Sequence, residues 1–149
     1  MAEYCVYIFH GFLSMRFISI TLTFILIGCA NQSAQIVKSK LTVPPTEAKG
    51  SSTQSLGAID LTSEVQLPNF HLRARAVTIE PGGYLAAHTH EGRPTMEYVA
   101  QGTVIEVRNG VATEHKAGTM VKAMNGVTHW WENQGTVPVV LVPVDITKP

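Results

Sequence analysis

Cysteine is scarce in this chain of 149 residues, and its two cysteines, Cys5 and Cys29, both lie in the first thirty residues, which are mostly apolar. The rest of the sequence therefore has no thiol for a disulfide bond or for a zinc–thiolate site. Any metal ion held by that part of the chain has to be bound through nitrogen and oxygen atoms.

The sequence also lacks an excess of charge of either sign. Eleven Lys and Arg balance eleven Asp and Glu, and no basic run is long enough to neutralise a series of phosphates. We therefore do not expect a nucleic acid as a partner. The length corresponds to a single domain, because domains usually contain about 100–200 residues.

Residues 1–28 are predicted to be a leader. From Met15 the sequence reads MRFISITLTFILIGCANQ, which is a basic start followed by an apolar run over residues 17–27 and by Gly28. Such a run has the length of a signal peptide and is too short to span a bilayer. Because this signal peptide is complete from Met15 onward, we expect the true start of the protein at Met15.

The residues that end the leader, Leu26 to Cys29, read LIGC and resemble the lipobox of bacterial lipoproteins. In that class the cysteine is acylated and becomes the new N-terminus. The resemblance implies a protein of the bacterial cell envelope, on the periplasmic or extracellular side, that is anchored to the membrane by lipid at Cys29. The alternative is a signal peptide that is cleaved elsewhere, with Cys29 an ordinary cysteine.

Residues 29–54 are predicted to be a flexible linker behind this anchor. The stretch over residues 31–54 is rich in Ser, Thr, Gln, Lys and Pro and has no apolar periodicity, so it is not expected to bury enough surface to become ordered. The folded domain is therefore predicted to occupy residues 55–149, starting near Leu56.

Short strands separated by turn residues are predicted throughout this domain. Asn109-Gly110 between two such runs indicates a hairpin, since both residues tolerate the positive φ of a type I′ turn. No stretch of useful length has a helical period. This pattern predicts an all-β fold, an antiparallel barrel or sandwich. The predicted strands are residues 73–79, 96–100, 103–107, 119–123, 129–132 and 137–144.

The candidate chemistry lies in the histidines. His88 and His90 are two residues apart on a predicted strand, so their side chains are expected on the same face. His129 follows on another strand, and Glu97 lies between. Imidazoles and a carboxylate suit a divalent ion of zinc, iron, nickel, copper or manganese. Taken alone, an HxH pair is also explained by surface or core histidines.

Two stretches resemble the conserved motifs of the cupin superfamily. Residues 82–102 (GGYLAAHTHEGRPTMEYVAQG) resemble the first motif, G(X)5HXH(X)3–4E(X)6G, and residues 118–133 (GTMVKAMNGVTHWWEN) resemble the second, G(X)5PXG(X)2H(X)3N. Fifteen residues separate the motifs, as in small single-domain cupins. The resemblance implies a cupin-type antiparallel β-barrel, or double-stranded jelly roll, with His88, His90 and His129 as metal ligands.

The chain departs from these motifs at two positions. Met124 replaces the proline of the second motif, which should loosen one turn without touching a ligand. Thr95 stands where the first motif has its glutamate, and the nearest carboxylate is Glu97, about 6.5–7 Å further along the strand. The fourth ligand is therefore open: water completes a three-histidine site, or Glu97 ligates the ion directly, or Glu97 supports a ligand.

Other polar and aromatic residues near the motifs have ordinary explanations. Trp130 and Trp131 flank His129 on a predicted strand, so one should face inward and the other outward, as barrel packing or as a subunit contact in a homodimer. Solvent-exposed positions explain several others as well as ligand binding does, and no role is assigned to Tyr98, Arg75, Arg93 or His115.

Two functions of different classes are compatible with this sequence. One is a metal-dependent enzyme that acts on a small molecule, such as a dioxygenase or another oxidoreductase or isomerase. The other is a non-catalytic module of the cell envelope that binds a small ligand or a metal ion. Cupins serve both purposes, and a fold alone does not decide between them.

Overall fold

The computed structural model describes residues 34–148. These residues form a nearly all-β fold with antiparallel strand pairs, so the predicted fold class is confirmed. The only helix in this part of the chain, α1, has four residues. No helix in the described residues is long and apolar enough to cross a membrane. The predicted leader and the anchor at Cys29 lie outside the described residues.

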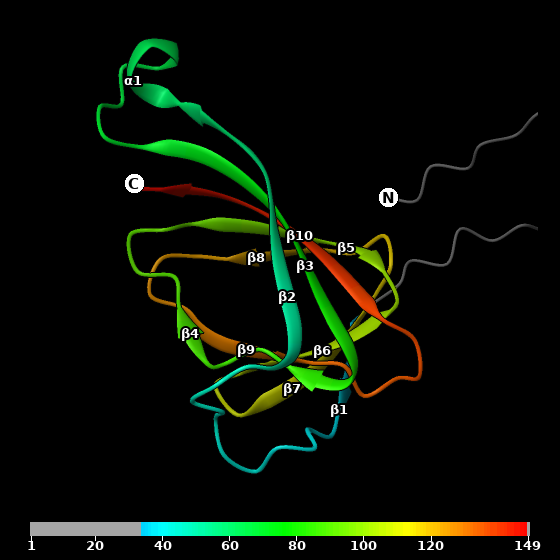
Figure 1. Ribbon diagram of the computed structural model, residues 1–149. Helices are drawn as coiled ribbons and strands as arrows, with labels where there is room; N and C mark the ends of the chain where they lie inside the picture. The colour runs from blue at the N-terminus through cyan, green and yellow to red at the C-terminus, as the bar shows by residue number, and fades with distance from the viewer. Residues whose placement is uncertain (1–33, 149) are drawn as a thin grey trace, which may run out of the picture. The chain divides into compact units, whose positions relative to one another are not determined.

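The strands form a sheet with the order β1-β7-β6-β9-β3-β10-β5-β8, in which β2 also pairs with β3 and β4 with β9. Figure 1 shows β2 beside β3 along its length. The elements are β1 (Gln35–Val37), β2 (Lys49–Asp60), α1 (Leu61–Glu64), β3 (His71–Tyr84), β4 (His88–Thr89), β5 (Thr95–Gln101), β6 (Thr103–Arg108), β7 (Val111–Lys116), β8 (Met120–Ala123), β9 (Thr128–Glu132) and β10 (Val139–Thr147).

The sheet curls so that its two halves share one apolar core. The halves are joined where β3 meets β9, at the single pair Tyr84 and Glu132. Burying this apolar surface is the main favourable contribution to folding. The core contains Val77, Ile79, Val99, Val121, Val139 and Leu141 from one half, and Val104 and Trp131 from the other.

The hairpin predicted at Asn109-Gly110 is confirmed. Strands β6 and β7 pair from Thr103 opposite Lys116 to Arg108 opposite Val111. Asn109 and Gly110 have φ values of 51° and 76°, as a type I′ turn requires at both central positions.

The predicted linker over residues 29–54 is wrong in part, because residues 35–37 and 49–54 belong to strands β1 and β2. Strand β2 pairs with β3 through its backbone while most of its side chains are exposed. A strand held in this way needs no apolar pattern, so its sequence looked like that of a solvated linker.

The segment that runs from the end of β1 to the start of β2 also covers the outer face of the β6-β7-β9 half. Val37 and Leu41 pack against the cluster that contains Trp130. One of the two tryptophans was expected to face outward, and Trp130 does so. It is nevertheless buried, because this segment lies over it. Glu132 fixes the segment, since its carboxylate accepts hydrogen bonds from the Ser39 hydroxyl and the Lys40 backbone N–H.

We expect the double variant Val37→Ser/Leu41→Ser to lose about 1–3 kcal/mol of unfolding free energy, because two apolar side chains leave a buried cluster. Tryptophan emission should shift to longer wavelength as Trp130 becomes solvated. The control is Val43→Ser, since Val43 lies in the same segment and is exposed. If the double variant is as stable as this control, the segment is a linker after all.

Candidate metal centre

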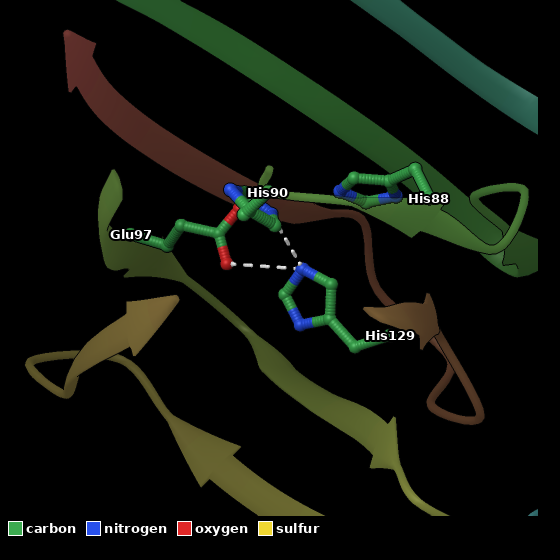
Figure 2. Close-up of side chains that lie close together, drawn as sticks. All are labelled: His88, His90, Glu97 and His129. Carbon is green, nitrogen blue, oxygen red and sulfur yellow. Dashed lines mark hydrogen bonds and ion pairs between the residues drawn. The ribbon is translucent and has the colours of Figure 1, made fainter. Parts of the chain in front are cut away.

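Four side chains converge inside the barrel: His88 on β4, His90 directly after it, Glu97 on β5 and His129 on β9. Each offers one nitrogen or oxygen atom, and these four atoms all lie within 4.8 Å of one another. Figure 2 shows the imidazole rings and the carboxylate gathered in one place. The structure thus brings together the four residues that the sequence singled out.

Strand pairing positions the histidines. The antiparallel pair of β4 and β9 places His88 directly opposite His129. The backbone N–H of His90 donates to the carbonyl of Val127 at 2.8 Å, which fixes the chain just beyond β4. The ring centroids of the three histidines are 4.8–5.1 Å apart. Both halves of the barrel contribute to the cluster, because Glu97 comes from β5.

Glu97 lies closer to the histidines than the motif spacing indicated. Its Oε2 atom is 3.7 Å from Nε2 of His129. Thr95, at the position of the family's glutamate, is buried on the same face of β5, and its Oγ1 is 2.8 Å from Nδ1 of His90. Thr95 therefore supports a candidate ligand, while Glu97 supplies the carboxylate of the cluster.

The Nδ1 atoms of His88 and His90 face hydrogen-bond acceptors. Nδ1 of His88 is 3.0 Å from the Ala86 carbonyl oxygen. Nδ1 of His90 is 3.2 Å from the Arg93 carbonyl oxygen, which also accepts from the Thr95 hydroxyl. Because a carbonyl oxygen can only accept, both rings carry their proton on Nδ1, and the Nε2 lone pairs are left for an ion.

The third ring is oriented by Glu106, a buried residue of β6 that the sequence analysis missed. Its Oε1 is 2.6 Å from Nδ1 of His129, and its Oε2 is 3.2 Å from Nε2 of His115. Burial alone would raise the pKa of Glu106, but hydrogen bonds from His115, His129 and Arg108 outweigh burial and lower it far below its ordinary value. Glu106 is therefore ionised and accepts from His129. Carboxylates commonly orient metal-binding imidazoles in this way.

The cluster fits a cation. Nε2 of His90 and Nε2 of His129 are 2.9 Å apart, and with both Nδ1 atoms protonated two lone pairs face each other. Oε2 of Glu97 is buried without a hydrogen-bond partner among the described residues. A divalent ion bound among these atoms, at the usual distances of about 2.0–2.2 Å, would satisfy all of them. The nitrogen-rich donor set suits zinc, iron, nickel, copper or manganese.

Burial also sets the protonation of the candidate ligands. It lowers the pKa of His88, and it lowers the pKa of His90 to about 4, with help from the neighbouring His129. It raises the pKa of Glu97 to about 7. At neutral pH His88 and His90 are therefore neutral, which is the form that binds metals.

The remaining residues considered from sequence have separate places. Trp131 is fully buried in the core, with its ring 5.3 Å from that of His129. Tyr98 is exposed on β5. Arg75 and Arg93 line a pocket of about 310 Å³, together with His88 and Glu97 of the cluster.

Comparison with known proteins supports the fold. Residues 75–146 match the family model described as "Cupin domain". A predicted oxalate decarboxylase from Thermotoga maritima has a similar structure, with 20% identity over 76% of this chain and 91% of that chain, and a TM-score of 0.57. No curated protein matches the chain.

Two further solved structures are similar. The Cupin_2 domain of an XRE family transcriptional regulator from Enterobacter cloacae has 17% identity over 68% of this chain and 99% of that chain, with a TM-score of 0.54. Oxalate oxidase in complex with the substrate analogue glycolate has 18% identity over 75% of this chain and 59% of that chain, with a TM-score of 0.51. At these identities the likeness concerns the fold alone. Together with the family match over residues 75–146, it supports a small cupin domain in this part of the chain.

Proposed function

We propose that this domain binds a divalent metal ion through His88, His90, Glu97 and His129 and presents it to a small molecule in the adjoining pocket. One observation carries the proposal. Three imidazole nitrogens and a carboxylate oxygen converge within 4.8 Å, on rings whose Nδ1 atoms all face hydrogen-bond acceptors.

The pocket supports a small-molecule ligand. Its volume of about 310 Å³ is at the lower end of the range of about 300–1,000 Å³ that is common for such sites. His88 and Glu97 belong to its lining, so a molecule in the pocket lies against candidate ligands. When bound, the ion would supply a positive charge that polarises a coordinated group, and iron or copper would also supply redox chemistry.

The protein residues have separate tasks in this proposal. Glu106 holds the proton on Nδ1 of His129, and Thr95 accepts from Nδ1 of His90. Both interactions keep the Nε2 lone pairs directed at the ion. The apolar side chains of Val77, Leu85 and Leu141 line the pocket and limit the water around its occupant.

We also propose that the protein is exported and anchored to the cell envelope through lipid at Cys29, on the resemblance of residues 26–29 to a lipobox. Mass spectrometry of the mature N-terminus should find an acylated Cys29, and Cys29→Ser should release the domain from membranes or leave the leader uncleaved. An unmodified N-terminus at Ala30 or Asn31 would mean ordinary secretion.

His88→Ala, His90→Ala and His129→Ala should each remove most of the bound metal, because two remaining imidazoles have lost a direct bond. The measurement is the zinc content of each purified protein after dialysis. His71→Ala is the matched control, since His71 lies on β3 outside the cluster and should leave one ion per chain. Full zinc content in His129→Ala would contradict the proposed centre.

Zinc affinity should fall as the pH falls below 7, because Glu97 has to lose its proton to bind and its pKa is about 7. Each pH unit below 7 should weaken binding about tenfold for one released proton. His90 contributes little to the pH dependence of zinc affinity between pH 8 and pH 6, since its pKa is about 4.

Competition with a chromophoric chelator at pH 6, 7 and 8 measures this dependence. Glu97→Gln should bind zinc more weakly at pH 8, and its affinity should change little down to pH 6 because the titrating carboxyl is gone. Equal pH dependence in the variant and in the wild type would show that Glu97 is not the group that releases the proton.

A further inference from the structure

The pocket beside the candidate metal centre has a cationic side. Arg75 on β3 and Arg93, which follows His90, both line it, with side chains that are 23% and 22% exposed. Arg75 lies two residues before the buried Val77, so both face the inside of the barrel. Two guanidinium groups therefore share one pocket with His88 and Glu97 of the cluster.

One buried carboxylate holds these arginines in place. Oδ2 of Asp145, on β10, is 2.9 Å from Nη2 of Arg75 and 2.7 Å from Nη1 of Arg93. Arg73 donates to both oxygens of Asp145, at 3.1 and 3.0 Å. Three guanidinium groups thus share one carboxylate, so Asp145 alone does not neutralise the two arginines that line the pocket.

The hydrogen-bonding capacity of the arginines is not used up. Nε of Arg75 is buried and has no hydrogen-bond partner among the described residues. A buried donor without a partner costs free energy, and more so when it belongs to a charged group. An acceptor with a negative charge is the natural partner for such a donor, and the planar guanidinium matches the geometry of a carboxylate.

We propose that the pocket binds a small organic carboxylate, with the carboxylate on Arg75 and Arg93 and the other end of the molecule at the metal centre. The contact of the ligand with the metal centre rests on the proposed function, whereas the carboxylate site on the arginines does not. The apolar side chains of Val77, Leu85 and Leu141 would pack against a short carbon skeleton between the two ends. The volume of about 310 Å³ fits a molecule of that size.

Arg73 separates this proposal from a purely structural role of the arginines. It makes two hydrogen bonds to Asp145, whereas Arg75 and Arg93 make one each, yet it is not part of the pocket lining. If the arginines only hold β3, β10 and the turn after β4 together through Asp145, losing Arg73 should matter as much as losing Arg75.

The test uses succinate, which has two carboxylates, and its neutral diamide as probes, with binding measured by calorimetry on the zinc-loaded and the metal-free protein. Succinate should bind at least tenfold more tightly than the diamide in both forms. Arg75→Met and Arg93→Met should each weaken succinate binding about ten- to hundredfold, as expected for lost charge-assisted hydrogen bonds. Arg73→Met is the control and should change it less than twofold.

The zinc content of every variant should equal that of the wild type. If Arg75→Met fails to fold, Arg75→Lys keeps the charge but loses the planar fork, and it should still weaken succinate binding several-fold. The proposal is overturned if the diamide binds as well as succinate, or if Arg73→Met weakens succinate binding as much as Arg75→Met. Arginine-dependent succinate binding by a protein that holds no zinc would uphold the carboxylate site and refute the proposed metal function.

Discussion

The candidate centre depends on the tautomer and the orientation of three imidazole rings. Carbonyl oxygens hold the proton of His88 and His90 on Nδ1, and the ionised Glu106 does the same for His129. All three Nε2 lone pairs are then directed inward, where Glu97 adds a carboxylate. Removing these acceptors would leave the same residues in place but free to rotate or change tautomer. The barrel therefore has to position the acceptors as well as the histidines.

Strand β9 connects this centre to the rest of the fold through its alternating side chains. His129 and Trp131 face inward, toward the cluster and the main core. Trp130 and Glu132 face outward, where the segment between β1 and β2 covers the tryptophan and donates hydrogen bonds to the carboxylate. The opposite side of the pocket is cationic, where Arg75 of β3 lines it and is held by Asp145 of β10. The residues at both ends of the pocket thus occupy inward-facing positions, which the pairing of the strands fixes.

Much of the fold and of the site could be predicted from sequence, because the decisive patterns are local. The Asn109-Gly110 turn and the strand patterns around it indicated an all-β fold, and the histidines carried the cupin motifs. The place of Glu97 could not be derived, since motif spacing does not show how far one side chain reaches into the barrel. Strand β2 was missed because most of its side chains are exposed, so its sequence has no apolar pattern. Glu106 could have been found, since it shares the inward face of its strand with Val104.

X-ray absorption at the zinc edge of the zinc-loaded protein tests the central claim most directly, because it counts the atoms bound to the ion and distinguishes imidazoles from other ligands. The account predicts one ion per chain with three imidazole nitrogens at about 2.0–2.1 Å and at least one oxygen. In Glu106→Gln the three imidazoles should remain, with zinc affinity lowered about 10–100-fold, since only an orienting partner is lost. A spectrum with fewer than three imidazoles, or a protein that retains no zinc, would contradict the account.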